Sequence, residues 1–442
     1  MKLLNNIIYV ETEPNESNFI IHPYLGDIFI VGDSEILTLK KWINEKEITC
    51  NTDKEKDFFE HLQSKKFTIN NENEEQEWIN KTLDIAKSYH EKQINSLNSA
   101  VFVLTYDCNF ACPYCYEGEI NQKPTNVLTT KMVDKIFSMY NNRIEKIALY
   151  GGEPLLPKTR EIIEYIIKKA PDAEYSLTTN GFYVLEFRDI LSRIKISNIM
   201  ITLDGSRERH NKTRILKSDK NSGTYDKIIE GINWLLKNNI CVKIRMNISE
   251  SNKEDCLNLR ENFIANYSAE FANGILKFEL QPIFQLNSQK REELNEELVY
   301  NLYQKDRIGY YNTMAISVTP ILDIFVKKNR KFIPRYAFCD AEGCRRFYDP
   351  DGEMYSCILA LKNKKASIGT YYPELEFKQH SMLKRNIETV GKCQECKFRF
   401  LCGGGCANAI IDSDGDVMKP NCSILNEVYN VLPKLFKDRV SK

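Results

Sequence analysis

The chain has 442 residues, of which 42% are hydrophobic and 28% are charged, so it is an ordinary globular sequence but too long for one compact core. Lysine plus arginine (61) equals aspartate plus glutamate (61), and this zero net charge argues against a general nucleic-acid-binding role. There is no run of about 18 apolar residues to span a membrane and no signal-peptide pattern at the N-terminus, so we expect a cytoplasmic protein.

Residues 1–90 are predicted to form a small mixed α/β unit followed by a polar linker helix. The expected strands are Ile7–Val10, Phe19–His22 and Asp27–Val31, and the expected short helices are Ser34–Trp42 and Lys54–Lys65. Residues 71–98 are polar and charged with a weak helical pattern, which indicates a solvated helix. No residue in this unit suggests catalysis.

Residues 91–320 alternate between strand and helix patterns, which predicts a parallel sheet with helical crossovers. The expected strands are Ala100–Leu104, Lys146–Tyr150, Glu174–Thr178, Asn198–Leu203, Cys241–Asn247 and Leu276–Pro282. The expected helices are Thr129–Asn142, Thr159–Lys169, Tyr225–Lys237, Glu254–Ala265 and one over about 290–305. We therefore predict an α/β fold containing a partial (β/α)6 barrel, whose active site would lie at the C-terminal ends of the strands.

Three cysteines directly follow the first barrel strand. Cys108, Cys112 and Cys115 have the spacing C-x3-C-x2-C. Three thiolates this close together can ligate three irons of a four-iron cluster, which leaves the fourth iron open. A zinc site is the alternative, but structural zinc sites close all four positions. The open position therefore favours an iron that binds a reacting molecule.

Short polar motifs follow the next three strands: Gly151-Gly152-Glu153-Pro154, Thr179-Asn180-Gly181 and Asp204-Gly205. The cysteine run together with Gly-Gly-Glu-Pro resembles the radical S-adenosylmethionine (SAM) superfamily. The resemblance implies that the three cysteines hold a [4Fe–4S] cluster whose open iron binds SAM. In that family one electron from the cluster cleaves SAM to methionine and a 5′-deoxyadenosyl radical, which abstracts a hydrogen atom from the substrate. A reductant such as flavodoxin or ferredoxin is then expected as a partner.

Other residues on the same rim are candidate SAM contacts. Tyr114 would lie near adenine, Glu153 would accept a hydrogen bond from a cationic amino group, and Gly151 and Gly152 would let the backbone approach the ligand. The remaining candidates are Asn180, Thr202, Asp204, Arg214, Arg245 and Asn247. A barrel-end arginine or asparagine is often structural, so both interpretations stay open for the last three.

Residues 321–442 are rich in glycine and cysteine, which predicts a loop-rich domain organised by metals. Eight of the 14 cysteines lie between Cys339 and Cys422. They resemble the SPASM extension of radical SAM peptide and protein maturases, which holds two auxiliary [4Fe–4S] clusters. By this resemblance one cluster is ligated by Cys339, Cys344, Cys357 and Cys406, and the other by Cys393, Cys396, Cys402 and Cys422. Two structural zinc sites are the alternative.

Two kinds of maturase compete. Maturases of ribosomally made peptides often carry a small winged-helix-like domain that binds the precursor's leader as an added β-strand, and residues 1–90 have a suitable size and strand content; a structural cap on the barrel is the alternative. Anaerobic sulfatase maturases, which make formylglycine, typically have an aspartate after the third cysteine of the extension, whereas Ile358 follows Cys357 here.

We therefore predict an enzyme that modifies a precursor peptide by forming a thioether or carbon–carbon crosslink. An anaerobic sulfatase maturase is the runner-up. A third possibility is a non-catalytic iron–sulfur or zinc-binding protein that carries electrons or acts as a scaffold. The open first site followed by Gly-Gly-Glu argues against this third possibility.

Overall fold

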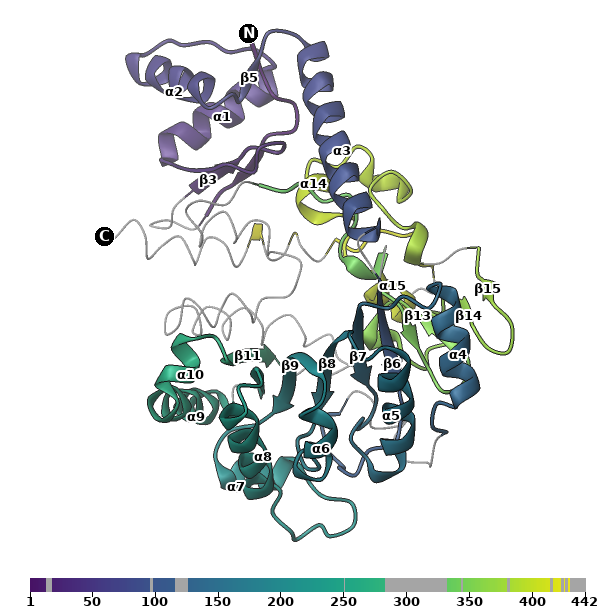
Figure 1. The fold of residues 1–442 in the computed structure, drawn as a ribbon. Coiled ribbons are helices and arrows are strands. Elements are labelled where there is room, and N and C mark those ends of the chain that lie inside the picture. The colour runs from purple at the N-terminus through teal and green to yellow at the C-terminus, as the bar shows by residue number, and fades with distance from the viewer. Residues whose placement is uncertain are drawn as a thin grey trace.

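The computed structural model describes residues 1–12, 18–95, 98–115, 126–249, 251–282, 332–342, 345–379, 382–413, 416–422, 425 and 428–429. Figure 1 shows an N-terminal unit (purple), a central sheet covered by helices (blue to teal) and a C-terminal region (green to yellow). The helix expected over about 290–305 and Cys344 lie outside the described residues. Within the described part of the chain, no helix has the length and apolar character needed to cross a membrane.

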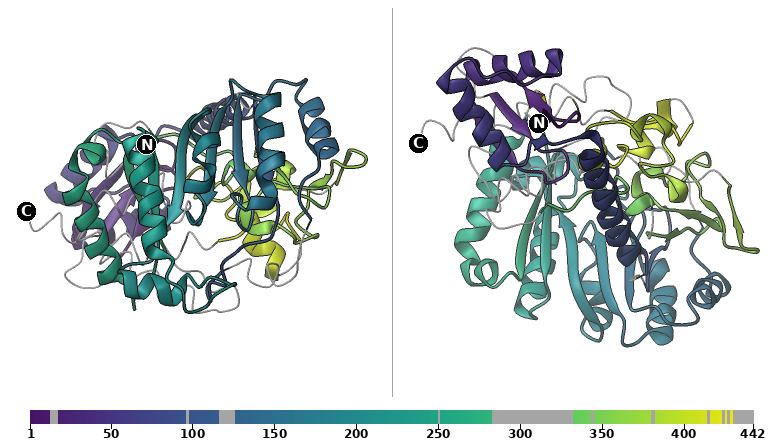
Figure 2. Two further views of the ribbon diagram at one scale, coloured as in Figure 1. Left: turned by 60° about the horizontal axis from the view of Figure 1, so that its bottom comes forward. Right: turned by 90° about the horizontal axis from the view of Figure 1, so that it is seen from above.

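The central sheet contains the six predicted parallel strands in the order β11-β10-β9-β8-β7-β6. Their bounds are β6 Ser99–Val103, β7 Lys146–Tyr150, β8 Glu174–Thr179, β9 Lys195–Thr202, β10 Val242–Ile248 and β11 Leu276–Pro282. The connecting helices are α4 Thr130–Met139, α5 Arg160–Lys169, α6 Arg188–Leu191, α7 Arg207–Thr213, α8 Tyr225–Lys237, α9 Lys253–Asn266 and α10 Ser268–Ala272. Helices cover one face of the sheet (Figure 2), and the α/β fold is confirmed.

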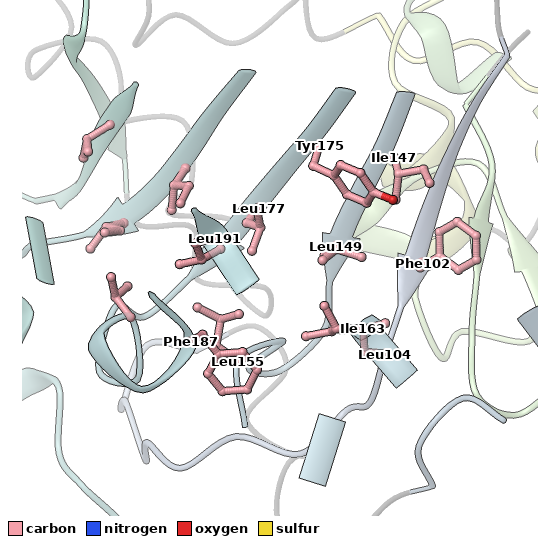
Figure 3. Packing of buried hydrophobic residues seen from close by; sticks show 14 of the residues in the cluster. Phe102, Leu104, Ile147, Leu149, Leu155, Ile163, Tyr175, Leu177, Phe187 and Leu191 are labelled. Carbon is pink, nitrogen blue, oxygen red and sulfur yellow. The ribbon is translucent and has the colours of Figure 1, made fainter. Parts of the chain in front are cut away.

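The hydrophobic core lies between the sheet and these helices. Along β10 every second residue is buried: Val242, Ile244, Met246 and Ile248. Figure 3 shows the same layer at β6, β7 and β8, where strand residues such as Leu149 and Leu177 face Ile163 and Leu191 from the covering helices. Because side chains alternate across a strand, the opposite face of the sheet is left free for polar residues.

The C-terminal region is rich in loops, as predicted, but its strands continue the barrel sheet, which the sequence did not predict. Strand β12 (Phe347–Tyr348) pairs in parallel with β6, and β13 (Glu353–Tyr355), β14 (Gly369–Thr370) and β15 (Glu376–Phe377) follow in antiparallel order. Over the residues that the structure describes, the result is one sheet of ten strands. The first strand of the C-terminal region therefore lies beside the strand that precedes Cys108.

Short helical segments complete the regions around the sheet. In the C-terminal region they are η5 Asp340–Glu342, η6 Ile358–Ala360, η7 Met382–Lys384, η8 Gly391–Cys393, α14 Arg399–Cys402 and α15 Ala407–Ser413. In the barrel they are η2 Pro157–Thr159 and η3 Leu185–Phe187.

The N-terminal unit has the predicted strands and helices. Strands β2 (Ile8–Val10), β3 (Asn18–Ile21) and β4 (Ile28–Val31) form an antiparallel sheet, β1 (Lys2–Leu3) pairs with β5 (Thr68–Ile69), and the helices are α1 (Asp33–Glu45) and α2 (Asp53–Ser64). The hydroxyl of Thr52 accepts a hydrogen bond from the amide of Glu55, whose carboxylate accepts one in return, and this capping box explains where α2 begins.

Helix α3 (Glu72–Asn95) is present as predicted, but one of its faces is not solvated. Glu75 is only 3% exposed, and its carboxylate accepts hydrogen bonds from the Asn5 amide (2.9 Å) and the Tyr24 hydroxyl (2.8 Å). Figure 1 shows α3 running from the N-terminal unit to the C-terminal region. The unit shares a hydrophobic core with that region, through Ile387, Val390, Cys393 and Phe400.

Candidate functional site

The loop after β6 carries the three cysteines predicted to hold a cluster. The backbone amide of Cys115 donates to the Cys112 carbonyl (3.2 Å), and the amide of Phe110 donates to Cys108 Sγ (3.3 Å). Burial raises the pKa of the Cys108 thiol to about 12, with the nearby Glu153 carboxylate as a second cause. Three cysteine sulfurs on one loop are the donors that iron–sulfur clusters use, so the donor set fits such a cluster.

Gly151 and Gly152 let the end of β7 touch the cysteine loop. A Cβ on Gly151 would lie 2.2 Å from the carbonyl oxygen of Thr105, and one on Gly152 would lie 2.4 Å from that of Tyr106. The Gly152 amide also donates to Thr105 O (3.0 Å). In the structure, the two glycines therefore let the end of β7 approach the backbone of the cysteine loop. Their approach to a ligand stays a prediction.

Glu153 is fully buried and joins the loops that follow β7 and β8. Its Oε1 accepts hydrogen bonds from the Leu155 amide (2.8 Å) and the Thr179 hydroxyl (2.6 Å), and its Oε2 accepts one from the Asn180 amide (2.6 Å). Burial raises the pKa of this carboxyl, and the three donors oppose that rise. The contact of Glu153 with a cationic amino group stays a prediction.

Asn180 links β8 to the cysteine loop. Its Nδ2 donates to Asn109 Oδ1 (2.7 Å) and lies 3.8 Å from Cys108 Sγ. Neither Asn109 nor Thr179 was predicted as a site residue. Both could have been noticed, because Asn109 directly follows Cys108 and Thr179 begins the Thr-Asn-Gly motif.

A buried polar group connects the cysteine loop to the end of β9. The Tyr114 hydroxyl donates to Asp204 Oδ2, and Arg214 Nη1 donates to the Tyr114 oxygen (3.3 Å). The Arg214 guanidinium also lies over the Phe110 ring, 5.4 Å from its centroid. Burial alone would lower the pKa of Arg214, but Cys112, Tyr114 and Asp204 raise it well above its usual value. The structure thus holds a cation next to the cysteine loop.

Three buried polar atoms around this group have no hydrogen-bond partner among the described residues: Asp204 Oδ1, Asn109 Nδ2 and Arg214 Nε. A buried polar atom without a partner costs about 1–3 kcal/mol, so such atoms usually await water or a ligand. An amino group would suit the Asp204 acceptor, and a carboxylate would suit the Asn109 and Arg214 donors. The residues present therefore fit a ligand with the polar groups of SAM.

The polar face of the sheet explains the other predicted residues. Thr202, Arg245 and Glu279 are register partners on β9, β10 and β11, so they lie side by side. Arg245 donates to Glu279 Oε1 from both Nε (2.9 Å) and Nη2 (2.5 Å). This ion pair favours the structural interpretation of Arg245. Asn247, which follows on the same face of β10, is half-buried, and its contact with SAM stays a prediction.

Among the described cysteines assigned to the first auxiliary cluster, Cys357 and Cys406 lie near one another. Burial raises the pKa of the Cys357 thiol to about 11, and the Cys406 thiol is the next cause. Cys339 is half-buried. The proximity of Cys357 to a residue about 50 positions later supports the interleaved ligand set that the resemblance implied.

The cysteines assigned to the second auxiliary cluster are also electrostatic neighbours. Burial raises the pKa of Cys393 to about 11, with Cys396 and Cys422 as further causes. Burial likewise raises the pKa of Cys402 to about 12, and Cys393 and Cys396 contribute. Within the described residues no three Cys, His, Asp or Glu side chains are arranged as ligands of one metal ion.

Comparison with known proteins agrees with this architecture. Residues 102–261 match the family described as the Radical SAM superfamily. GTP 3′,8-cyclase of Clostridium perfringens is 30% identical over 325 residues, covering 68% of this chain and 95% of the relative. The cysteine-type anaerobic sulfatase-maturating enzyme of Clostridium novyi is 24% identical over 343 residues, covering 71% of this chain and 88% of the relative.

Two solved structures share the fold at low sequence identity. Native anSMEcpe with bound AdoMet superposes with a TM-score of 0.56 at 18% identity, covering 78% of this chain and 100% of that one. Streptococcus suis SuiB bound to the precursor peptide SuiA superposes with a TM-score of 0.53 at 14% identity, covering 96% of this chain and 99% of that one. The fold shared with SuiB thus extends over nearly the whole chain.

Proposed function

Because this chain belongs to the radical SAM superfamily, we propose that it is a maturase that crosslinks a ribosomally made precursor peptide. The observation that carries this proposal is the fold shared with SuiB over 96% of the chain, since SuiB was crystallised with a precursor peptide. The match to GTP 3′,8-cyclase covers only 68% of the chain and leaves the remainder without a role.

The proposed catalytic site combines the cysteine loop with the polar group beside it. Cys108, Cys112 and Cys115 would hold a [4Fe–4S] cluster, and the unpartnered atoms of Asp204 and Arg214 would contact SAM. When bound, the cluster and SAM supply a 5′-deoxyadenosyl radical that takes a hydrogen atom from the peptide. The protein supplies binding, orientation and exclusion of water.

The chain's own residues would do this by fixing the rim of the barrel. Glu153 holds the loops after β7 and β8 together through three hydrogen bonds, and Asn180 extends that connection to Cys108. Burial raises the pKa of the Cys112 thiol, and the Arg214 cation opposes that rise, because a positive charge stabilises a thiolate. Burial of this network keeps water from the position where the radical would form.

The C-terminal cysteines would hold two auxiliary [4Fe–4S] clusters. Cys339, Cys344, Cys357 and Cys406 form one proposed ligand set, and Cys393, Cys396, Cys402 and Cys422 form the other. Four thiolates close a cluster fully, so these clusters would serve as redox centres for the electron released when the new bond forms. The proposed product is a peptide with a thioether or carbon–carbon crosslink.

The N-terminal unit would bind the leader of the precursor. Strand β4 is one of the two outer strands of its three-stranded sheet within the described residues, and it is the one with a large exposed apolar side chain, Ile30, which is 46% exposed. An exposed strand edge binds an extended peptide through backbone hydrogen bonds, and apolar side chains beside it add affinity. The shared core between this unit and the region around Cys393 would hold the leader site at a fixed position relative to the auxiliary clusters.

The leader proposal is tested by substituting Ile30 with glutamate and measuring affinity for a cognate precursor peptide. Loss of apolar contact and a new charge should weaken binding about tenfold. Ile85→Glu is the matched control, since Ile85 is a 40% exposed isoleucine on α3. Equal affinity for wild type and the Ile30 variant would reject β4 as the leader site.

The catalytic proposal is tested with anaerobically reconstituted enzyme, SAM, dithionite and the same peptide. We expect 5′-deoxyadenosine and a peptide lighter by two hydrogens, the mass change of one new crosslink. Replacing Cys108, Cys112 and Cys115 together with alanine should abolish 5′-deoxyadenosine, whereas Cys241→Ala, a half-buried thiol outside the motifs, should not. Cleavage of SAM by the triple variant would exclude these cysteines as cluster ligands.

Sulfatase maturation is the second candidate, favoured by the similarity to the Clostridium novyi enzyme and to anSMEcpe. Against it, Ile358 stands after Cys357 where that group typically has an aspartate. The same assay with a sulfatase-derived cysteine peptide separates the two functions. Conversion of cysteine to formylglycine changes the mass of the peptide by a different amount than a crosslink does. A protein that yields no 5′-deoxyadenosine with either peptide would instead fit a non-catalytic iron–sulfur protein.

A further inference from the structure

Arg385 is a buried arginine whose hydrogen-bonding capacity is fully used. It follows η7 in the C-terminal region and is 0% exposed. A guanidinium has five N–H donors, and each of them has a hydrogen-bond acceptor here. Nε donates to Val417 O (2.8 Å), Nη1 to Glu342 Oε1 (2.8 Å) and Gly405 O (2.7 Å), and Nη2 to Gly404 O (2.5 Å) and Lys419 O (3.0 Å).

These acceptors belong to three different segments that carry cysteines. Glu342 comes three residues after Cys339, the two glycines lie between Cys402 and Cys406, and Lys419 comes three residues before Cys422. One side chain therefore contacts segments from both proposed ligand sets. Arg385 itself lies outside those three segments and is not one of the proposed cluster ligands.

Glu342 extends the contact to the backbone of the first segment. It is 1% exposed, and its Oε2 accepts hydrogen bonds from the amides of Phe338 and Cys339 (3.2 Å for Cys339). Its Oε1 takes the Arg385 donor. The Arg385–Glu342 pair thus fixes the backbone at Cys339 against the segment from Cys402 to Cys406.

The glycine triplet, residues 403–405, allows the segments around Arg385 to approach one another closely. Gly403, Gly404 and Gly405 all have positive φ (69°, 96° and 74°). A Cβ on Gly405 would lie 1.9 Å from the carbonyl oxygen of Asn421, and one on Gly404 would lie 3.1 Å from Arg385 Nη1. The Asn421 amide donates to Gly404 O (3.1 Å). The residue before Cys422 is therefore bonded to the same carbonyl that accepts from Arg385 Nη2.

We propose that Arg385, together with Glu342, is a positioning residue that holds the cysteine segments of both auxiliary clusters in register. The inference rests on the proposed ligand sets. A lysine could keep the charge but offers three donors on a flexible stem, so it could not satisfy all five acceptors at once.

The test compares Arg385→Met and Arg385→Lys with Lys384→Met, a control on the exposed neighbouring residue. Iron and sulfide are measured after anaerobic reconstitution, and electron paramagnetic resonance distinguishes the SAM-binding cluster by its response to SAM. In Arg385→Met we expect about threefold less iron, because only the SAM-binding cluster of three remains. Arg385→Lys should stay well below wild type. Full iron content and unchanged auxiliary signals in Arg385→Met would overturn the proposal.

A second variant and a second measurement keep the test decisive. Glu342→Gln retains an acceptor for the Cys339 amide but removes the charge, so the auxiliary signals should broaden while the SAM-binding signal is kept. Amide hydrogen exchange at Cys339 and Asn421 should be about tenfold faster in Arg385→Met than in the control. If wild type binds only about four irons, the proposed clusters fail, yet the exchange rates still decide the role of Arg385: faster exchange supports it and equal exchange refutes it.

Discussion

Tyr106 and Asp349 connect the cysteine loop of the barrel to the C-terminal region through one buried hydrogen bond. The Tyr106 hydroxyl donates to Asp349 Oδ2 at 3.0 Å, and both side chains are fully buried. Tyr106 lies two residues before Cys108, while Asp349 directly follows β12, the strand that pairs with β6. Asp349 Oδ1 also accepts hydrogen bonds from the amides of Asp351 (3.0 Å) and Glu353 (2.9 Å). The same carboxylate therefore fixes the turn that leads toward Cys357, a proposed ligand of the first auxiliary cluster.

Replacing Tyr106 with phenylalanine should lower the free energy of unfolding by about 1–3 kcal/mol, because the buried Asp349 carboxylate loses a donor while the ring volume is kept. Tyr165→Phe is the matched control, since its hydroxyl also bonds a carboxylate, Asp134 (2.9 Å), but at the surface. The control should change stability by less than about 0.5 kcal/mol. Urea unfolding measures the loss of unfolding free energy in both variants. Equal losses would show that the buried Tyr106–Asp349 hydrogen bond stabilises the fold no more than the exposed one does.

The stability of the protein should also depend on the protonation of Asp349. Burial raises its pKa from 3.8 to about 6. Between these values the folded protein keeps a proton that the unfolded chain has released, so the free energy of unfolding falls as pH rises through this window and levels off above about pH 6. The fall attributable to Asp349 would be up to about 3 kcal/mol.

Asp349→Asn should remove that part of the pH dependence. The amide oxygen can still accept from the two backbone amides, and its NH2 can donate to the Tyr106 oxygen. Urea unfolding from about pH 4 to about pH 7 should show the variant gaining stability relative to wild type as pH rises. Parallel curves for the two proteins would mean that Asp349 is already ionised in the folded state at low pH.

Much of the fold could be predicted from local sequence patterns. All six barrel strands were located, because alternating or continuous apolar runs followed by glycine-containing motifs are local signals. The pairing of β12 with β6 was missed, since Phe347–Tyr348 is only two residues long and its partner lies about 245 positions earlier. Glu75 was assigned to a solvated face for a related reason: its partners at Asn5 and Tyr24 are distant in sequence.

The candidate site was predicted by residue type but not by partner. The sequence pointed to Glu153, Asn180 and Arg214 as ligand contacts, which stay predictions, and in the structure each bonds another part of the protein. A motif shows which side chains stand at strand ends, but the neighbour of each one depends on how the strands pair. Glu279 and Arg385 carried no motif at all, so only the folded arrangement identifies their roles.

Gly152→Ala should disrupt the cysteine loop. The added Cβ would lie 2.4 to 2.8 Å from backbone atoms of Tyr106 and Asp107, and backbone atoms next to a cluster loop cannot yield as a flexible side chain would. We expect a loss of stability of about 1–3 kcal/mol and reduced iron at the SAM-binding site. Gly391→Ala is the control, because a Cβ there has no neighbour within 4 Å. Iron analysis with both variants at matched purity measures the effect, and equal iron content would contradict the steric argument.

Arg214 and Arg245 were equivalent candidates in the sequence, and the structure predicts different outcomes for the same substitution. Arg214→Lys loses the contact that reaches both the Tyr114 hydroxyl and the Phe110 ring, so SAM binding should weaken about tenfold. Arg245→Lys keeps an ion pair with Glu279, so SAM binding should change by less than about twofold.

Equilibrium binding of SAM to the reconstituted enzyme tests this difference, with iron content measured alongside to confirm that the cluster is intact. Arg245→Lys serves as the control for Arg214→Lys, because both remove a guanidinium from the rim and keep a positive charge. A loss of SAM affinity confined to Arg214→Lys would separate the two roles that the sequence left open. Similar losses in both variants would instead mean that Arg245 leaves Glu279 to contact the ligand, since its pairing in the structure gives it no other route to SAM.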